Sequence, residues 1–287
     1  MKETRQTVKR LFLFAGYDPQ CIVDDTLVYY TKQLSRFGDV VLHMDSDCPK
    51  NELKKLTSHC LHADAVRHGE YDFGSYKRAY LWATKNLNMG DYDFVYLIND
   101  SVYGPFFDLA EYFNKMESGD YGAFGMVDKV GGHSPHIQSW FIGTRPIVFL
   151  SKWFDEFMKS VKQEKTKSAV AVIYETGFTN RLNERNIPYK CIYSVHGRGV
   201  YNKIRMLYDK KMPFLKKVAF IRHDGGFGTQ IKYILNRIPS DLSERILNSA
   251  RRVYGDKVVN EELARSAFAN KIRQIKYGLK KLIAGQI

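Results

Sequence analysis

The chain has few cysteines, and they are scattered. Cys21, Cys48, Cys60 and Cys191 show no Cys-x-x-Cys spacing, so the sequence lacks the pattern of a structural zinc site and offers no disulfide framework. We therefore expect these thiols to be reduced and to serve mainly in packing.

Long apolar runs are also missing. No segment approaches the roughly eighteen uncharged apolar residues that a bilayer-spanning helix needs. The apolar stretch Leu11–Ala15, after Lys9 and Arg10, is too short for the core of a secretion signal. These absences predict a cytoplasmic protein. Its 287 residues, 44% of them hydrophobic, suffice for one large domain with an appendage.

Acidic residues are scarce in the last part of the chain. Residues 1–197 carry 24 Lys and Arg and 24 Asp and Glu. Residues 198–287 carry 20 Lys and Arg and 7 Asp and Glu, so they account for the whole net charge of +13. The first part is therefore neutral and the tail is basic. A basic tail suits an anionic partner, either a membrane surface or a nucleic acid.

The pattern within residues 271–287 favours the membrane. Apolar side chains share one helical face, and basic side chains lie beside or opposite it. The apolar set is Ile272, Ile275, Leu279, Leu282 and Ile283, and the basic set is Lys271, Arg273, Lys276, Lys280 and Lys281. We expect this helix to contact an anionic membrane surface. The alternatives are a helix that packs on its own domain and an RNA-binding tail, but no nucleic-acid module accompanies the charge.

Strands and helices are expected to alternate over residues 1–200. The pattern predicts strands at residues 9–16, 39–44, 92–98, 121–126 and 189–193, and helices at 24–37, 51–60, 106–116, 147–161 and 178–185. This order predicts an α/β fold with a mostly parallel sheet flanked by helices. We assign residues 1–200 to a catalytic domain and residues 201–287 to a basic, mainly helical extension.

An apolar run ends abruptly at Asn99, Asp100 and Ser101. Residues 94–98 are continuously apolar rather than alternating, as in a strand covered on both faces. The carboxyl ends of such strands are where open α/β sheets bind ligands. We expect the three polar side chains to hold a metal-bound diphosphate or a sugar. An ordinary strand-ending turn is the alternative.

A glycine-flanked loop and a helix precede this strand. From Ser75 onward, apolar residues recur at spacings of three and four, at Tyr76, Ala79, Tyr80, Ala83 and Leu87. This spacing predicts a helix that packs one face on the sheet and then leads into the strand.

Four sequence blocks together resemble one known family. They are Phe14–Pro19 (FAGYDP), Tyr71–Lys77 (YDFGSYK), Asn99–Phe106 (NDSVYGPF) and His136–Ser139 (HIQS). In this order they are similar to the rhamnan synthesis protein F family, bacterial glycosyltransferases that assemble polysaccharides. The resemblance implies a GT-A fold, in which a similar loop and helix precede the strand that carries an Asp-x-Asp motif, and it implies a nucleotide-sugar donor.

The Asn-Asp-Ser cluster departs from the usual Asp-x-Asp motif. A single carboxylate, Asp100, is a poor site for a divalent cation unless the diphosphate supplies further oxygens. A Mg²⁺ or Mn²⁺ cofactor is therefore an open expectation, and the resemblance to GT-A enzymes implies a late histidine that completes the metal shell if a metal is present. His196 is preferred to His223 because it follows the last expected strand. A solvated loop histidine is the alternative for both.

Loop residues supply the first candidates for donor binding. Tyr17 and Asp18 follow the first strand, where Tyr17 is expected to stack on the base and Asp18 to accept a hydrogen bond from the base or the ribose. Asp45, at the end of the second strand, is a further candidate for the base or the ribose. Both aspartates also suit a turn or a helix cap.

The loop before the helix supplies further donor candidates. Arg67 and Lys77 offer positive charge to a diphosphate, and Asp72 offers a bidentate acceptor to sugar hydroxyls. His68 is a secondary candidate, because a lone histidine is more often structural.

His136, Gln138 and Ser139 are candidates for binding the acceptor or the donor sugar. They follow the flexible pair Gly131 and Gly132 and offer hydrogen bonds, while Trp140 offers an apolar face to a sugar ring. The alternative is a strand whose alternate residues point inward.

Glu175 is the candidate for the chemistry. The resemblance to inverting GT-A enzymes implies a general base next to a helix that contains an Arg-Leu pair, here Arg181 and Leu182. The acceptor hydroxyl must lose its proton as it attacks the anomeric carbon, and a carboxylate can accept it. The alternative role is an acidic residue that stabilises a helix start.

These expectations combine into one function. The chain is expected to be an inverting glycosyltransferase that moves L-rhamnose from dTDP-rhamnose onto a lipid-linked cell-surface polysaccharide of the O-antigen type, at the inner face of the membrane; the sugar comes from the resemblance. The alternatives are a galactofuranosyl or other hexosyl transferase, a sugar nucleotidyltransferase, whose triphosphate loop residues 14–20 lack, and a membrane-surface scaffold without catalysis.

Overall fold

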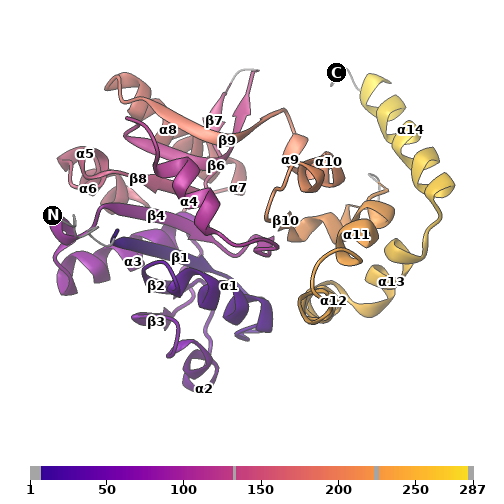
Figure 1. Cartoon of the computed structure of the whole chain (residues 1–287), viewed down its shortest axis with the longest axis horizontal. Helices are drawn as coiled ribbons and strands as arrows, with labels where there is room; N and C mark the ends of the chain where they lie inside the picture. The colour runs from indigo at the N-terminus through magenta and orange to yellow at the C-terminus, as the bar shows by residue number, and fades with distance from the viewer. Residues whose placement is uncertain (1–7, 132–133, 223–225, 284–287) are drawn as a thin grey trace, which may run out of the picture. The chain divides into compact units, whose positions relative to one another are not determined.

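The computed structural model describes residues 8–131, 134–222 and 226–283 (Figure 1). The chain divides into two compact units. The first unit is Met1–Asp100 with Asp108–Gly197, and the second unit is Ser101–Phe107 with Arg198–Ile287. The sequence suggested a single boundary at residue 200. In the structure, the second unit also includes the short segment Ser101–Phe107.

The first unit is built on a mixed sheet with the strand order β3-β2-β1-β4-β8-β6-β7, in which β9 also pairs with β6. Strands β1 to β4 run parallel to one another, as do β6 and β9, whereas β7 and β8 are antiparallel to their neighbours. The predicted α/β fold with a mostly parallel sheet is confirmed. The strands are β1 (Arg10–Gly16), β2 (Asp39–Met44), β3 (His62–Ala65), β4 (Phe94–Asn99), β6 (Ala123–Val130), β7 (His136–Ile137), β8 (Phe141–Thr144) and β9 (Tyr189–His196).

Helices cover one face of this sheet, and the core beneath them combines aliphatic and aromatic side chains. The helices are α3 (Tyr71–Asn86), α5 (Pro146–Phe149), α6 (Lys152–Ser160), α7 (Lys167–Val170), the π-helix Ala171–Thr176 and α8 (Gly177–Glu184). The Phe73 ring of α3 packs edge-on against Phe157 of α6 and lies tilted against Tyr174 of the π-helix. The apolar stripe predicted for α3 faces this core, which includes Tyr76, Ala79, Tyr80 and Ala83.

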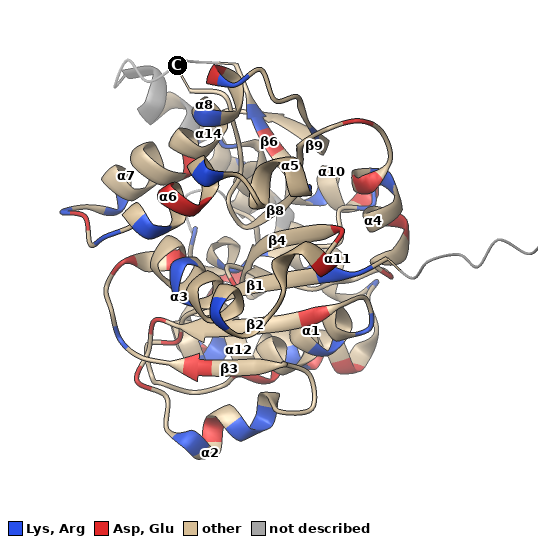
Figure 2. Ribbon diagram, turned by 90° about the vertical axis from the view of Figure 1, so that its left-hand side faces the viewer, with Lys and Arg blue, Asp and Glu red and all other residues tan. Residues whose placement is uncertain are grey.

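The other face is covered by α1 (Asp25–Ser35) and α4 (Ala110–Glu117). Ring centroids of Phe14 and Tyr30 lie 5.2 Å apart, and those of Phe12 and Phe113 lie 5.6 Å apart. Strands β1 and β4 are thus buried on both faces, which explains their continuous apolar runs. Figure 2 shows that Lys, Arg, Asp and Glu lie mainly on the helices and loops around these strands.

Several predicted boundaries are wrong. The helix expected at 106–116 begins only at Ala110, whose N–H donates to Asp108 Oδ1 at the start of the helix. The helix expected at 147–161 is two helices, since the Ser151 hydroxyl accepts from Phe154 N and starts a new one. The helix expected at 51–60 is the short α2 (Lys50–Leu53) followed by a 3₁₀ turn at Lys54–Leu56. Strand β3 was not predicted.

The second unit is mainly helical, as expected for the basic extension. A two-stranded antiparallel ladder joins β5 (Val102–Tyr103) to β10 (Leu215–Lys216). The helices are α9 (Gly199–Asn202), α10 (Ile204–Asp209), α11 (Gly228–Leu235), α12 (Ser240–Tyr254), α13 (Asp256–Ala264) and α14 (Ala267–Ile283). Across the described residues, no helix combines the length and the apolar character needed to cross a bilayer.

Helix α14 turns its apolar stripe outward. Phe268, Ile272, Ile275 and Leu279 recur at spacings of four, three and four, and all four side chains are exposed. Asn270 lies on the opposite side of the helix, where it is buried and its Nδ2 lies 3.4 Å from Thr229 Oγ1. Among the described side chains of α14, the buried one is therefore polar and lies opposite the apolar stripe. The side chains of Lys280, Lys281, Leu282 and Ile283 lie outside the described set.

Candidate active site

Three loops meet at the carboxyl edge of the parallel strands. Strand β1 pairs in parallel with both β2 and β4, with Gly16 opposite Met44 and Ala15 opposite Asn99. The loops that follow these strands carry the predicted residues Tyr17, Asp18, Asp45 and Asp100. This edge, at the point where the strand order reverses, is the usual ligand site of open α/β sheets.

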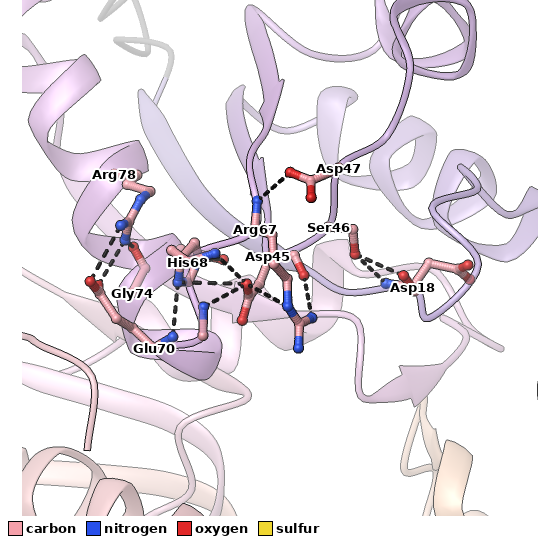
Figure 3. Close-up of polar contacts among 11 residues, drawn as sticks. Asp18, Asp45, Ser46, Asp47, Arg67, His68, Glu70, Gly74 and Arg78 are labelled. Atoms are coloured by element: carbon pink, nitrogen blue, oxygen red, sulfur yellow. Dashed lines mark hydrogen bonds and ion pairs between the residues drawn. The ribbon is translucent and has the colours of Figure 1, made fainter. Parts of the chain in front are cut away.

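Asp45 holds the loop that follows β3. Its Oδ1 accepts hydrogen bonds from the backbone N–H groups of His68, at 2.8 Å, and Gly69, at 2.9 Å (Figure 3). Arg67 lies beside it, with NH1 donating to the Asp45 carbonyl at 2.8 Å and Nε 3.7 Å from Oδ1. Burial alone raises the pKa of the Asp45 carboxyl, but the backbone donors and the Arg67 charge lower it below its usual value.

His68 is a structural residue of this loop. Its Nδ1 accepts from the Glu70 backbone N–H at 3.0 Å, so in the neutral ring Nε2 carries the proton and faces Ser75 Oγ at 3.0 Å. Burial, followed by the nearby Arg78 charge, lowers the pKa of His68. A side chain at position 74 would lie 2.6 Å from the His68 ring, so the close packing here requires Gly74.

Tyr17 and Asp18 are fixed in different ways. Asp18 is buried, and its Oδ1 accepts from the backbone N–H groups of Gln20 and Ile22, while its backbone is paired with the Ser46 hydroxyl. The Asp18 carboxylate thus shapes its own turn, which is the alternative that the sequence left open. Tyr17 is 46% exposed, and the Arg67 guanidinium lies 5.1 Å from its ring centroid. Its ring remains accessible to a base.

Asn99 and Asp72 form a pair at the end of β4. Asn99 Nδ2 donates to Asp72 Oδ2 at 2.7 Å. Asp72 lies in the first turn of α3, so the loop and helix before β4 do meet its carboxyl end as the sequence suggested.

Glu175 lies in the π-helix, and one of its oxygens is held by Ser139. Glu175 Oε1 accepts from Ser139 N at 2.8 Å and from Ser139 Oγ at 2.9 Å. The Ser139 carbonyl in turn accepts from the Tyr76 hydroxyl at 2.9 Å. Glu175 Oε2 lies 3.9 Å from His136 Nε2, beyond hydrogen-bond distance. One carboxylate oxygen is therefore anchored and the other points to a histidine.

The residues around Ser139 differ in what they can offer a substrate. His136 Nδ1 donates to the Ser134 carbonyl at 2.7 Å, which turns Nε2 toward Glu175. Gln138 Oε1 accepts from Trp140 Nε1 at 2.9 Å, and both side chains are buried. Trp140 is only 3% exposed, so the expectation that its face binds a sugar ring is wrong.

Two residues that the sequence predicted to bind the sugar donor, Lys77 and Ser101, make hydrogen bonds within the protein. Lys77 Nζ donates to the Val161 carbonyl at 2.6 Å, at the end of α6. Ser101 belongs to the second unit, where its hydroxyl accepts from Lys216 Nζ at 2.9 Å and its carbonyl accepts from Lys217 N. Within the first unit, Asp100 N donates to the Ala15 carbonyl, which ties the end of β4 to β1.

The expected metal ligands do not form a complete site. Within the described residues, no group of three or more His, Cys, Asp or Glu side chains could hold a metal ion. His196 lies at the end of β9, opposite Val130, and is exposed. His223 lies outside the described residues. These side chains do not by themselves fit a divalent cation, so no chemical step below uses one.

The family model of rhamnan synthesis protein F matches residues 40–257, which is more than half of the chain. The chain belongs to the rhamnan synthesis protein F family. Three of the four sequence blocks, at residues 71–77, 99–106 and 136–139, lie within the matched range, and the family places the chain among glycosyltransferases that use nucleotide sugars. No curated protein matches the chain.

Three solved structures with low similarity to this chain have names that describe sugar transferases. A putative nucleotide-diphospho-sugar transferase from Desulfovibrio desulfuricans has 12% identity and a TM-score of 0.39, over 95% of this chain and 98% of that one. GlyE of Streptococcus pneumoniae has 16% identity and a TM-score of 0.40, over 72% and 49%. The Saccharomyces cerevisiae mannosyltransferase Ktr4p has 9% identity and a TM-score of 0.35, over 58% of this chain and 62% of that one.

Tyr76 contacts the candidate site, although the sequence did not indicate this. It was assigned only to the apolar face of its helix, but its hydroxyl carries the contact to Ser139. A tyrosine at a core position usually finds a hydrogen-bond partner, and that is the signal available in the sequence.

Replacing Asp45 with Asn should lower the free energy of unfolding by about 1–2 kcal/mol near pH 7, because hydrogen bonds to a carboxylate are stronger than those to an amide. The folded pKa of Asp45 lies below its ordinary 3.8, so its contribution is complete above that value and is lost as the pH falls through the folded pKa. Urea unfolding at several pH values checks this.

Asp47→Asn is the control. Asp47 is exposed, and within the described part of the chain its Oδ1 accepts one backbone hydrogen bond, from Arg67 N. Asp47→Asn should lower the free energy of unfolding by less than Asp45→Asn does. If Asp45→Asn lowers the free energy of unfolding by the same amount at acidic pH as at pH 7, the proposed role of the Asp45 charge is contradicted.

Proposed function

We propose that the chain is an inverting glycosyltransferase that transfers L-rhamnose from dTDP-rhamnose to a lipid-linked polysaccharide of the O-antigen type. The family description, rhamnan synthesis, supports rhamnose as the sugar. The observation that carries the proposed chemistry is the arrangement of Ser139 and Glu175. A galactofuranosyl or other hexosyl transferase would use the same residues, but the family description favours rhamnose.

Glu175 is proposed as the general base. The backbone N–H and the hydroxyl of Ser139 both donate to Oε1 and so fix the orientation of the carboxylate. Oε2 is then oriented toward an acceptor hydroxyl. The Glu175 side chain is 22% exposed, so a substrate can reach it. A surface charge at a helix start would need no such anchoring.

The proposed reaction is a single displacement. Glu175 Oε2 takes the proton from the acceptor hydroxyl as that oxygen forms a bond to the anomeric carbon. The bond between this carbon and the diphosphate oxygen breaks, and its electron pair leaves with the nucleotide diphosphate. His136 and Ser139 would hold the acceptor or the donor sugar beside Glu175, and Gln138 would support them from within.

The donor is proposed to lie along the carboxyl ends of β1, β2 and β4. Tyr17 would stack on the base, and Arg67, which is half exposed, would face the diphosphate. Asp18 and Asp45 would act by shaping their loops. The proposed sugar and diphosphate contacts within the first unit are Asp72, Asn99 and Asp100. A divalent cation, if used, would bind through Asp100 and the diphosphate oxygens, with His196 as a further candidate.

Glu175→Gln should reduce sugar transfer about 10²–10⁴-fold while donor binding stays intact, because the amide keeps the shape but cannot accept the proton. Transfer from dTDP-[¹⁴C]rhamnose to a lipid-linked acceptor measures the first quantity, and calorimetric titration with dTDP-rhamnose measures the second. Glu184→Gln, at a side chain that is 66% exposed, is the control and should transfer normally.

Unchanged transfer by Glu175→Gln would reject Glu175 as the base. A loss of donor binding together with transfer would instead indicate a role in building the donor site. A wild-type chain that neither binds nor transfers any sugar would favour the non-catalytic scaffold.

We further propose that α14 attaches the protein to the inner, anionic face of the cell membrane. The exposed side chains Phe268, Ile272, Ile275 and Leu279 form an apolar stripe, and exposed Lys271 and Lys276 lie on the same helix. An apolar stripe can enter the lipid boundary while the lysines contact anionic headgroups. This combination suits a lipid surface better than a nucleic acid, which would need no exposed apolar stripe.

Replacing Ile275 and Leu279 together with Asn should reduce sedimentation with anionic phosphatidylglycerol vesicles several-fold, because the variant loses buried apolar area. The control is Gln274→Asn, an exposed polar position on the same helix. Binding should also weaken as salt is raised, since the lysines are screened. Equal sedimentation of the double variant and the control would contradict the proposal.

A further inference from the structure

A pocket separate from the candidate active site lies at the β3 edge of the sheet, between strands β2 and β3 and helix α3. Its volume is about 360 Å³, within the range of about 300–1,000 Å³ that ligand sites occupy. Its main lining side chains are His43, His62, Asp64, Val66, Arg78 and Trp82. The proposed transfer reaction uses none of them.

His43 leaves a buried polar atom in this pocket. Its side chain is 6% exposed, and among the described residues its Nε2 has no hydrogen-bond partner. Its other ring nitrogen faces the Val66 backbone, and burial lowers the pKa of His43 to about 4. The ring is therefore neutral at physiological pH, with Nε2 as an acceptor. A buried acceptor without a partner costs free energy, so a donor is expected to reach it.

The rest of the lining combines an aromatic wall with balanced charge. The rings of His62 and Trp82 are stacked, with centroids 4.3 Å apart and planes at 7°. The Arg78 guanidinium is paired with Glu70 at 2.7 Å, and Asp64 contributes a carboxylate, so the lining carries no excess positive charge. Phosphate ligands prefer a cationic site. An uncharged ring with hydroxyls that donate and accept fits better.

We propose that this pocket binds a sugar unit of the glycan on which the enzyme acts. A hydroxyl would donate to His43 Nε2, a second would donate to Asp64, and the ring would lie against the apolar and aromatic wall. The inference rests on the proposed function, because that function supplies a glycan as the partner.

The pocket adjoins the donor-side loop. The ring centroid of His43 lies 5.6 Å from that of His68, and Arg78 donates to the Gly74 carbonyl at 2.9 Å as well as to Glu70 (Figure 3). A sugar in the pocket would thus contact side chains that pack directly on the loop held by Asp45. Glycan held here would also stabilise that loop.

Saturation-transfer NMR on the full chain tests this site, with methyl α-L-rhamnopyranoside as the probe. The wild-type chain should transfer saturation to the probe. His43→Leu and, separately, Asp64→Asn should each weaken binding about tenfold, the effect of losing one good hydrogen bond. Asp64 is exposed, so its variant keeps the fold even if His43→Leu does not. His59→Leu, outside the pocket, is the control and should bind normally.

Saturating dTDP-rhamnose separates this site from the proposed active site, and it should leave the probe signal of the wild-type chain unchanged. A probe signal that dTDP-rhamnose abolishes and His43→Leu keeps would overturn the proposal, as would absence of binding to the wild-type chain, which would mean that water alone satisfies His43. Failure of the proposed function is read separately, by calorimetric titration with dTDP-rhamnose.

Discussion

The parallel pairing of β1 with both β2 and β4 is the constraint on which the candidate site depends. This pairing brings the ends of three strands to one edge, so Tyr17, Asp45 and Asn99 become neighbours although they are far apart in the sequence. The strands must be apolar throughout because helices cover both of their faces. The same burial that holds the sheet together therefore also fixes where polar chemistry can occur.

Two buried or half-buried carboxylates then give this edge its shape. Asp45 is held by two backbone N–H groups, and Glu175 by the N–H and the hydroxyl of Ser139. In each arrangement, backbone N–H groups find a hydrogen-bond acceptor in the carboxylate, and these bonds fix the position of that carboxylate. Asp45 uses its charge to hold a loop, whereas the second carboxylate oxygen of Glu175 is the one that we propose to face the substrate.

The sequence was a good guide to elements and a poorer guide to contacts. The apolar run before Asn99 and the spacing in α3 follow from burial, which is periodic and visible in the sequence. The anchoring of Glu175 by Ser139, the use of Lys77 at the end of α6 and the burial of Trp140 depend on packing between distant segments. No local pattern encodes such contacts, so they required the structure.

The most direct test of the central claim is a thermal-shift comparison of dTDP-rhamnose with UDP-, GDP- and CMP-sugars, each with and without Mn²⁺. A donor at one hundred times its dissociation constant should stabilise the fold by about 2.7 kcal/mol. A shift with dTDP-rhamnose that exceeds those of the other donors is the predicted result. No shift with any nucleotide sugar would contradict the assignment of this edge as a donor site.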